Sequence, residues 1–443
     1  MVAVTPFLLQ IPLLVGAVSA CLLPWEREGG PRPDMHLMSR QASETIPIGT
    51  GNRWKNKVPR GLGTQPGDTT VTSVMNPAEL RSAIDSLAKE FKIEVFNAPE
   101  ETAEGATMFG AKVGGGKAKG KGDTLYSAFF TAGIHARERG GPDNLVYFIA
   151  DLLWAKREKT GVTYGGRRYT NKEVNQALDV GIVFMPLLNP DGVAYDQETD
   201  KCWRRNRNPT APVDLNRNFD FLWDYKKSFS PEVTGGNTGI ASDDPASDVY
   251  HGTKVFSEPE TRNVKWALNK FKSISWTLDI HSFAGLVLYS WGDDFNQITD
   301  PNMNILNEEY DGVRGVLVDT NETEYRSYQE LDVWKQDSFV SVRVADAMNS
   351  AITGLRTPMT ATQSINLYAT SGALSDYVSA RNLLDSKLGA AHGLTLEFGQ
   401  DNNEAVVCPF YVKEAEFNNN IRQVGAGLME FLLAAAEAGL RGR

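Results

Sequence analysis

The chain has 443 residues, of which 41% are hydrophobic and 23% charged, so it can bury the large core of one or two globular domains. Its formal net charge of -10 gives nucleic-acid phosphates and anionic membranes no electrostatic reason to bind it. Composition therefore argues against a nucleic-acid partner and against adhesion to membranes.

Residues 1–20 form a short apolar segment without a charged side chain, ending in the small-x-small pattern Val18-Ser19-Ala20. Such a segment is typical of a secretory signal peptide. An N-terminal anchor helix is the alternative, although two prolines and the short length argue against a membrane span. No other stretch approaches about 18 uninterrupted apolar residues. We therefore expect a secreted, extracellular protein without membrane contact after signal cleavage.

The sequence contains three cysteines. Cys21 lies at the predicted cleavage point, which leaves Cys202 and Cys408 as the natural disulfide pair in an oxidising compartment. Neither of these two has the CxxC neighbour that a cysteine metal site would need. We therefore predict a Cys202–Cys408 disulfide bond.

Residues 21–75 carry scattered Pro, Gly, Arg, Ser and Thr without helical or strand periodicity. They are predicted to be a flexible leader, either a short propeptide or an extension that wraps the core. The pattern then changes, because Asn76 occupies a cap position, Pro77 a first turn, and apolar residues follow at helical spacing through Phe91. The folded domain is therefore predicted to span residues 76–443.

A Gly/Lys-rich run over residues 114–122 separates two strand-like stretches, 108–113 and 124–130. The run lacks the spacing of a phosphate-binding loop, and no helix follows it. We therefore expect the tip of a β-hairpin there.

Farther along the chain, apolar strand-like runs alternate with amphipathic helical patterns. Strands are expected at 181–188, 273–280, 286–289 and 393–398, and helices at 142–156, 256–271, 339–351 and 414–436. This alternation implies an α/β fold with a mixed, mainly parallel central β-sheet and helices on both faces. Ligand sites in such folds gather at the carboxyl ends of strands. Polar residues fall at strand ends at His135, Asn189, His281 and Glu397.

A His-x-x-Glu turn, His135 to Glu138, follows a strand directly. A catalytic zinc takes three protein ligands from His, Asp or Glu and leaves one position for water. Among the five histidines of the chain, His281 is the best third ligand because it also ends a strand. Taken alone, the turn also fits a structural histidine or a surface ion pair, and these residues leave that alternative open.

Further motifs follow in order along the chain. They are Asn189-Pro-Asp-Gly, Trp203-Arg204, Asp214-Leu-Asn-Arg-Asn-Phe, Tyr250-His-Gly, Ser257-Glu-Pro-Glu, His281-Ser, Tyr368-Ala-Thr-Ser-Gly and Leu394-Thr-Leu-Glu-Phe. Together with the Gly133-Ile-His-Ala-Arg-Glu turn, these motifs mean that residues 76–435 resemble the zinc metallocarboxypeptidases of the carboxypeptidase A type. The resemblance implies a carboxypeptidase-like catalytic domain, and a peptide hydrolase that removes single C-terminal residues.

The resemblance also implies a role for each matching residue. One Zn²⁺ per chain would be held by His135, Glu138 and His281, with Glu397 as general base and Arg204 as the cation that stabilises the oxyanion. A guanidinium fork suits a terminal carboxylate better than a lysine does. The substrate-binding residues would be Arg137, Asn216, Arg217, Tyr368 and Ser375.

The position that sets side-chain preference in this family matches Ser375. The same pocket would be lined by Thr370, Ala373 and Thr395. An uncharged floor favours neutral, apolar or aromatic C-terminal residues. Asp279, two residues before His281, leaves a preference for Lys or Arg open if it points into the pocket; the other interpretation of Asp279 is a structural hydrogen-bond acceptor.

Peptide or protein C-termini are the expected substrates, and we expect a monomer. Two rival functions are a catalytically silent zinc- or peptide-binding relative, and a zinc amidohydrolase of the same fold acting on non-peptide or modified chain ends. The presence of Glu397 and Arg204 argues against the first rival. The Asn216-Arg217 pair argues against the second.

Overall fold

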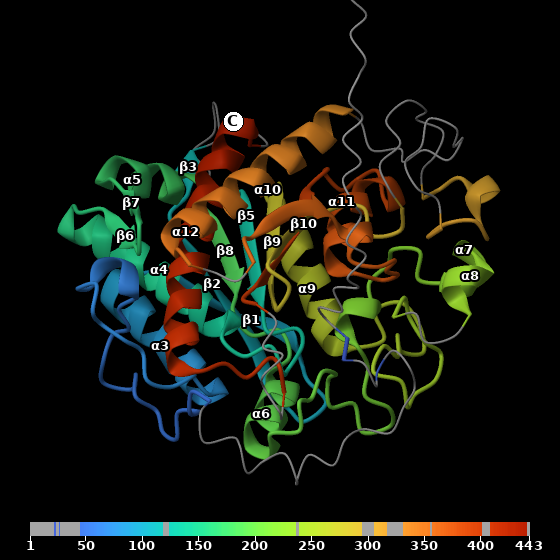
Figure 1. The fold of residues 1–443 in the computed structure, drawn as a ribbon, viewed down its shortest axis with the longest axis horizontal. Coiled ribbons are helices and arrows are strands. Elements are labelled where there is room, and N and C mark those ends of the chain that lie inside the picture. The colour runs from blue at the N-terminus through green and yellow to red at the C-terminus, as the bar shows by residue number, and fades with distance from the viewer. Residues whose placement is uncertain are drawn as a thin grey trace, which may run out of the picture.

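The computed structural model describes residues 22–23, 26, 45–117, 124–235, 239–294, 305–316, 331–354, 357–400 and 408–440. The predicted signal peptide over residues 1–20 and the tip of the predicted hairpin at residues 118–123 lie outside this part. Figure 1 shows a central sheet with helices on both of its faces. The predicted α/β architecture is therefore confirmed.

The central sheet has the strand order β1-β2-β8-β5-β9-β12-β10-β11. These strands span Glu94–Glu101 (β1), Thr107–Val113 (β2), Ala128–Ala132 (β5), Ile182–Met185 (β8), Trp276–Ser282 (β9), Leu286–Tyr289 (β10), Thr360–Gln363 (β11) and His392–Phe398 (β12). The middle of the sheet, β8-β5-β9-β12, is parallel throughout. Antiparallel pairs flank it at β1-β2-β8 and at β12-β10. The sheet is thus mixed, with a parallel centre, as predicted.

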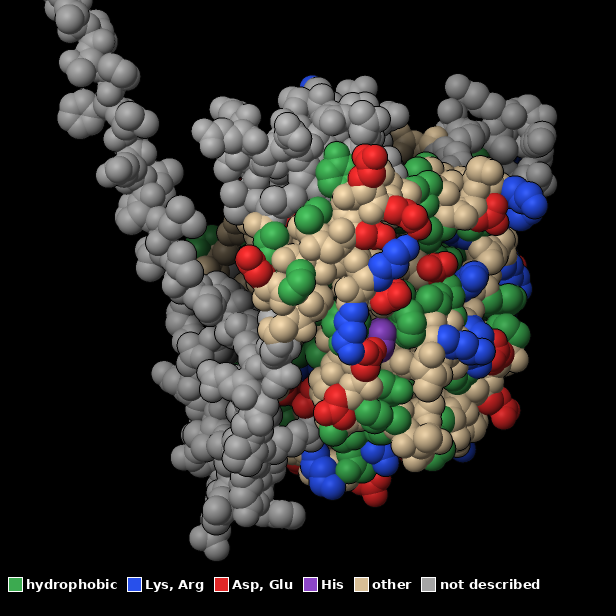
Figure 2. Space-filling view, turned by 90° about the vertical axis from the view of Figure 1, so that its right-hand side faces the viewer, with side chains coloured by type: hydrophobic (Ala, Val, Ile, Leu, Met, Phe, Trp, Pro, Cys, Tyr) green, Lys and Arg blue, Asp and Glu red, His purple; other side chains and the backbone are tan. Residues whose placement is uncertain are grey.

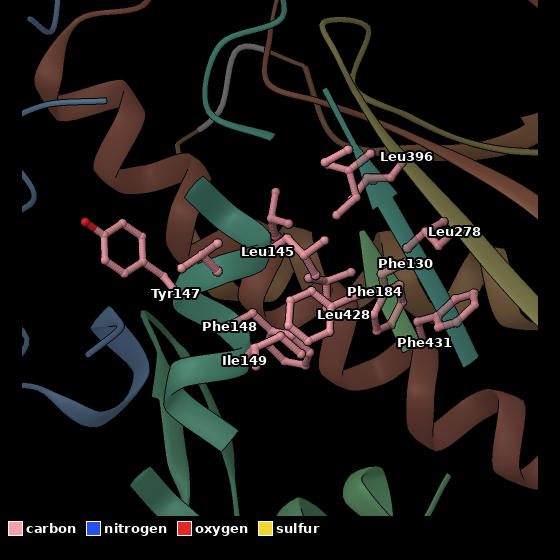
Figure 3. Close-up of a cluster of buried hydrophobic side chains, with 14 of the residues drawn as sticks. Phe130, Leu145, Tyr147, Phe148, Ile149, Phe184, Leu278, Leu396, Leu428 and Phe431 are labelled. Atoms are coloured by element: carbon pink, nitrogen blue, oxygen red, sulfur yellow. The ribbon is translucent and has the colours of Figure 1, made fainter. Parts of the chain in front are cut away.

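The helices form one layer on each face of the sheet. One layer contains α3 (Pro77–Phe91), α4 (Gly141–Glu158), α5 (Asn171–Val180), α10 (Leu331–Ala351) and α12 (Glu414–Ala438), and the other contains α9 (Pro259–Lys270) and α11 (Leu374–Leu384) (Figure 1). Phe130 packs in the core of the first layer and its neighbour Phe129 in the core of the second. Figure 3 shows the first core, in which Phe431 of α12 lies beside Phe130. Both faces of β5 are covered, so each of its five residues is buried, and four of them are apolar.

Helix α3 begins where the sequence predicts. The Asn76 side chain accepts a hydrogen bond from the Glu79 N–H at 2.8 Å, and the Glu79 carboxylate accepts one from the Asn76 N–H at 3.3 Å. This reciprocal capping box satisfies two N–H groups that the helix itself leaves unpaired. The Asn76 side chain also donates to the carbonyl of Gly49, so the helix start is tied to the preceding segment.

Residues 45–75 pack against the domain as an extension that wraps the core. Ile46, Leu62 and Val74 are buried in the same core as α4 and α12. The Ile46 N–H donates to the carbonyl of Val412, far along the chain. The apolar side chains of this stretch are therefore covered by the core.

Some elements differ from the predicted ones. The strand expected at 273–280 is β9, which runs through Ser282 and so includes His281. The Asn189-Pro-Asp-Gly motif opens helix α6 (Pro190–Thr199), whose first turn is capped by the Asn189 side chain. Strand β1 and helices α5 and α11 were not anticipated. The expected hairpin is present, since β3 (Gly116–Lys117) pairs antiparallel with β4 (Thr124–Leu125).

The predicted disulfide bond between Cys202 and Cys408 is present. Among the described helices, none is long and apolar enough to cross a bilayer. Figure 2 shows one face of the molecule, where acidic and basic side chains are interspersed over the described residues. The net negative charge is therefore not gathered into a single patch on that face.

Candidate metal centre and substrate site

Polar and apolar side chains alternate near the carboxyl ends of β9 and β12. Leu278 and Leu396 belong to the core of α4 and α12. Because side chains alternate along a strand, Asp279, His281 and Glu397 face the opposite side. Glu397 of β12 is in register with His281 of β9. Parallel strands lie about 4.8 Å apart, so these two side chains are neighbours at the end of the sheet.

The turn after β5 is held in place by Asn189. Gly133 begins this turn with a left-handed φ of 68°. The Asn189 side-chain amide donates to the carbonyls of Ile134 and Arg205, each at 3.1 Å. One side chain thus fastens the His135 turn to the segment that carries Arg204. This accounts for the Asn-Pro-Asp-Gly motif in structural terms.

His135, Glu138 and His281 come together in a buried cluster. The His135 Nδ1 lies 2.6 Å from one Glu138 carboxylate oxygen, and the His281 Nδ1 lies 3.0 Å from the other. One potential ligand atom of each residue lies within 4.8 Å of those of the other two. Two imidazoles and one carboxylate form the donor set of a catalytic zinc site. The three predicted ligands are therefore positioned as a metal site.

Each imidazole turns its second nitrogen toward a buried carboxylate. The His135 Nε2 lies 3.1 Å from Asp214 Oδ1, and the His281 Nε2 lies 2.7 Å from Asp279 Oδ2. Zinc-ligating histidines are usually oriented in this way, since the carboxylate holds the N–H of one nitrogen and leaves the other for the metal. The donor set and its surroundings therefore fit Zn²⁺.

Asp279 is a structural acceptor. Besides its contact with His281, its other oxygen accepts a hydrogen bond from the Thr131 hydroxyl at 2.6 Å. Both carboxylate oxygens of Asp279 thus have a hydrogen-bond partner within the sheet. These contacts favour the interpretation of Asp279 as a structural acceptor over the one in which it points into the specificity pocket.

The buried acids of the site are held in their ionised form. Burial opposes ionisation of Glu138, but His135 and His281 outweigh it and hold the pKa of the Glu138 carboxyl far below its usual range. Burial also opposes ionisation of Asp214, and there Arg204 and His135 hold the pKa well below the ordinary value. Glu138 therefore offers an anionic oxygen at neutral pH.

Arg204 shares Asp214 with the metal cluster. Its Nε and Nη2 donate to Asp214 Oδ2 at 3.0 and 2.9 Å, and both side chains are fully buried. Asp214 therefore connects a ligand histidine to a fixed guanidinium. The sequence motif that contains Asp214 predicts roles for Asn216 and Arg217 but none for Asp214 itself. The need of most zinc-binding histidines for an orienting carboxylate is the signal that could have pointed to Asp214.

Residues of two further motifs accept hydrogen bonds from the Asp214 segment. The Asp214 N–H donates to the Tyr250 carbonyl at 2.8 Å. The Asn218 side-chain amide donates to the His251 carbonyl at 2.8 Å and to the Ser257 hydroxyl at 2.9 Å. The Tyr-His-Gly and Ser-Glu-Pro-Glu motifs therefore position the site without entering it.

Asn216, Arg217 and Tyr368 lie together at the start of α11. Asn216 accepts a hydrogen bond from the Leu374 N–H at 2.8 Å. The Arg217 guanidinium donates to the Gly239 carbonyl at 2.9 Å and approaches the Tyr368 hydroxyl at 3.5 Å. The structure thus brings the predicted carboxylate-binding residues to one place, beside the helix that carries Ser375.

A family model described as zinc carboxypeptidase matches residues 82–425. The chain belongs to the zinc carboxypeptidase family. The matched span lies inside the domain predicted from residue 76 onward. Membership agrees with the cluster of His135, Glu138 and His281, which is the site expected to bind zinc.

Several relatives of this chain are known. A carboxypeptidase B from Astacus astacus is 33% identical over 230 residues, covering 50% of this chain and 65% of the relative. A protein named inactive metallocarboxypeptidase ecm14, from Talaromyces stipitatus, is 30% identical over 203 residues, covering 44% of this chain and 30% of the relative. The chain thus matches less than two thirds of the length of these relatives.

A solved structure supports the fold. The carboxypeptidase A from Helicoverpa armigera superposes with a TM-score of 0.57 at 20% identity, covering 83% of this chain and 73% of that one. This likeness shows that the carboxypeptidase fold is shared.

The predicted specificity residues Ser375 and Thr395 are buried and uncharged, but the residue after Ser375 is an acid. Ser375 is 7% exposed and Thr395 is 8% exposed. Asp376, the next residue of α11, accepts a hydrogen bond from the Gly292 N–H at 3.1 Å. Burial, with the charge of Asp293 nearby, raises the pKa of Asp376 to about 7. Sequence reasoning did not single out Asp376, although it is adjacent to Ser375.

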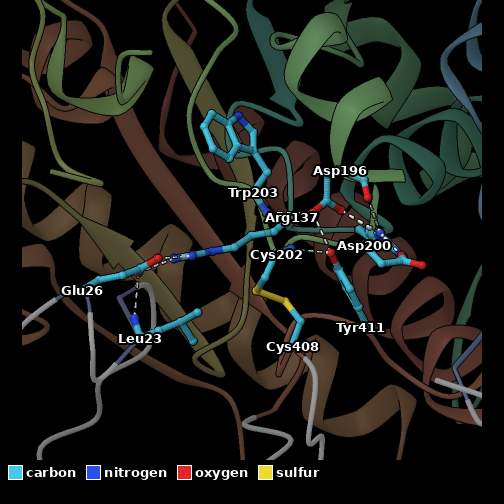
Figure 4. The surroundings of a disulfide bond; sticks show 10 residues. Leu23, Glu26, Arg137, Asp196, Asp200, Cys202, Trp203, Cys408 and Tyr411 are labelled. Carbon is cyan, nitrogen blue, oxygen red and sulfur yellow. Dashed lines mark hydrogen bonds and ion pairs between the residues drawn. A yellow bond between two sulfur atoms is a disulfide. The ribbon is translucent and has the colours of Figure 1, made fainter. Parts of the chain in front are cut away.

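Arg137 is buried in the turn between the predicted ligands His135 and Glu138, and its guanidinium is paired with a side chain of the leader. Its guanidinium forms an ion pair with Glu26 and lies 4.5 Å from the centre of the Phe410 ring. Figure 4 shows this pair beside the Cys202–Cys408 disulfide bond. Sequence reasoning predicted a substrate-binding role for Arg137 and none for Glu26.

Proposed function

We propose that this protein is a secreted zinc exopeptidase that removes single residues from the C-termini of peptides or proteins. The observation that carries the proposal is the shared Asp214 carboxylate, which joins the ligand His135 to the buried Arg204. Asp214 thereby fixes the position of the Arg204 guanidinium relative to the predicted metal ligands. Bound zinc would polarise the scissile carbonyl and make water acidic enough to react at neutral pH.

Glu397 is the proposed general base. It is 3% exposed and lies in register with the ligand His281, at the end of a rigid strand. A carboxylate in this place can take the proton of the attacking water and pass it to the leaving amine. Its position on β12 rather than on a loop favours a constant distance to the reacting atoms.

Arg204 is the proposed electrophilic partner of the reaction. Its contact with Asp214 keeps the guanidinium in one orientation within the buried site. Negative charge develops on the scissile carbonyl oxygen as water adds, and a preorganised cation stabilises that charge without reorganisation. The silent-relative alternative would lack this function, and both Arg204 and Glu397 argue against it.

Asn216, Arg217 and Tyr368 are proposed to bind the terminal carboxylate of the substrate. Arg217 offers a planar fork that can donate two hydrogen bonds to one carboxylate. The Tyr368 hydroxyl lies 3.5 Å from an Arg217 nitrogen, so it can close over the same group. Recognition of a free carboxylate would make the enzyme an exopeptidase and disfavour modified chain ends.

The preferred C-terminal side chain is proposed to be neutral, apolar or aromatic. This preference is supported by the uncharged Ser375 and Thr395, and by the engagement of Asp279 with His281 and Thr131. Secretion is supported by the apolar N-terminal segment and the disulfide bond, whereas the monomeric state and the lack of a nucleic-acid partner stay predictions.

The test is hydrolysis of N-blocked dipeptides ending in Phe, Leu, Lys or Arg, over a range of concentrations, with and without a zinc chelator. We expect release of the free C-terminal residue, loss of release with the chelator, and its return with Zn²⁺. A matched set with amidated C-termini should be resistant. Cleavage of the amidated set would favour the amidohydrolase, and zinc binding without cleavage of any substrate would favour the silent relative.

A further inference from the structure

Asp196 of α6 is a buried carboxylate that joins two segments carrying predicted site residues. Its Oδ2 accepts a hydrogen bond from Arg139 Nε at 2.9 Å, and its Oδ1 accepts one from the Trp203 N–H at 2.8 Å. Asp196 is 0% exposed. Arg139 directly follows the predicted ligand Glu138, and Trp203 directly precedes Arg204. One carboxylate therefore connects the chain beside a metal ligand with the chain beside the proposed oxyanion-stabilising cation.

The Arg139 guanidinium is held in one orientation by several contacts. Besides its bond to the Asp196 carboxylate, its Nη2 donates to the Asp196 carbonyl at 2.9 Å and to Asp200 Oδ1 at 2.7 Å. Its central carbon lies 3.6 Å from the centre of the Tyr411 ring. Burial opposes the charge, but Asp196 outweighs burial and raises the pKa of Arg139. A charged and fixed fork therefore restrains the chain next to Glu138.

The Tyr411 hydroxyl connects Asp196 to the disulfide bond. It donates to Asp196 Oδ1 at 2.6 Å and accepts from the Cys202 N–H at 2.9 Å. Burial and the charge of Asp196 raise the pKa of Tyr411 well above its ordinary value, so the hydroxyl keeps the proton that it donates. The Tyr411 N–H donates to the Cys408 carbonyl at 3.0 Å. Figure 4 shows Tyr411 and Asp196 beside the Cys202–Cys408 disulfide.

The backbone at Cys202 has a conformation that these contacts maintain. Its φ is 53°, in the left-handed region that residues other than glycine rarely adopt. Such a conformation is strained and persists only where the surroundings fix it. The disulfide bond and the Tyr411 hydroxyl fix Cys202, and the Asp196 carboxylate fixes the next residue, Trp203. This turn sets the direction in which the chain enters Arg204.

We propose that Asp196, Arg139 and Tyr411, called here the Asp196 network, are positioning residues of the catalytic site. The network holds Glu138 and Arg204 at a constant separation, so that the metal and the cation act on the same carbonyl group. This inference rests on the proposed function, because it takes the roles of Glu138 and Arg204 from it. A displacement of about 1 Å at a catalytic group can lower the rate by about 10²-fold, so loss of the network should reduce kcat.

The main test is Tyr411→Phe, which removes one hydroxyl from the network and keeps the ring beside Arg139. We expect kcat in the dipeptide assay to fall about tenfold with KM nearly unchanged, because Arg204 stabilises charge that develops only in the transition state. The matched control is Tyr164→Phe. Tyr164 donates to the buried Asp151 carboxylate at 3.1 Å, in the core on the other face of the sheet. The control should lose similar stability and keep wild-type kcat.

Zinc affinity provides a readout that does not depend on catalysis. Competition with a fluorescent chelator should show weaker zinc binding in Tyr411→Phe and in a second network variant, Arg139→Lys, than in the wild type and the Tyr164→Phe control. We expect a change of about 3–10-fold, less than the roughly 10–100-fold of a partner in direct contact with a ligand.

The outcomes separate the inference from the proposed function. Network variants whose kcat equals that of the Tyr164→Phe control would overturn the inference, whatever their stability, and leave the proposed function standing. If the wild-type protein hydrolyses no substrate, the proposed function fails. Unchanged zinc affinity in Tyr411→Phe and Arg139→Lys would then overturn the inference as well, whereas weakened affinity would support it.

Discussion

The two faces of strands β9 and β12 differ in chemistry, although both are formed by the same strands, whose successive residues point to opposite sides of the sheet. Leu278 and Leu396 face α4 and α12 and are fully buried among apolar side chains. Asp279, His281 and Glu397 face the other way and form the end of the polar site. A shift of one residue in register would exchange the two sets. The apolar face therefore fixes the geometry of the chemical face.

The largest expected effect is on the chemical face. Glu397→Gln keeps the size of the side chain but removes its basicity, so kcat should fall by roughly 10²–10⁴-fold. Zinc content, measured by atomic absorption, should stay at one per chain because His135, Glu138 and His281 are unchanged. A variant that retains wild-type kcat would remove Glu397 from the mechanism.

The next largest effect is expected for Leu396, which precedes Glu397 in β12 and lies on the apolar face. Leu396→Ala should lower the free energy of unfolding by about 2–5 kcal/mol, because it opens a cavity in a packed core. Urea denaturation followed by circular dichroism measures this loss. The folded fraction should keep nearly wild-type KM and kcat, and a selective loss of kcat would show that the two faces are not independent.

A smaller effect, on zinc affinity, is expected for the carboxylates that contact the ligand histidines. Asp214→Asn removes the charge that orients His135, and substitutions of this kind weaken zinc binding by roughly 10–100-fold. Competition with a fluorescent chelator measures the zinc dissociation constant. Asp279→Asn is the matched variant at His281, and unchanged affinity in both would contradict the orienting role of these carboxylates.

The smallest expected effect concerns Asp376. Its pKa is raised to about 7 by burial and by Asp293, so in the folded state it binds a proton that the unfolded chain releases near pH 4. Stability is therefore lost as pH rises from about 4 to 7. Asp376→Asn should remove this loss and raise Tm by at least about 2 °C at pH 8, with a smaller change at pH 4. Differential scanning calorimetry at the two pH values measures it, and an equal shift at both would refute the assignment.

Several site residues could be found from local patterns. His135 and Glu138 follow a strand that ends at a glycine, and His281 and Glu397 end apolar runs, so their meeting at one edge of a parallel sheet is predictable. The partners of these residues could not be found in the same way. Asp214 lies 79 residues from His135 along the chain. No periodicity in the sequence records which carboxylate a histidine will meet.

The sequence by itself determined the elements with a strong local signal. Helix α3 starts at its capping box, and the central strands follow runs rich in apolar residues, because hydrogen-bonding and burial patterns repeat within a few residues. Helix α11 was missed since it is covered on most sides and shows little apolar periodicity. The segment of residues 45–75 has no period either, so its wrapping was visible only in the fold.

Only the tertiary structure decided how charges pair across the site. The contact of His135 with Asp214, and that of Glu26 with Arg137, join segments that the sequence leaves unconnected. Buried charges must find partners, because an unpaired ion in the interior costs several kcal/mol. Which partner each one finds depends on the three-dimensional arrangement of strand ends and turns, and that arrangement is a property of the whole core.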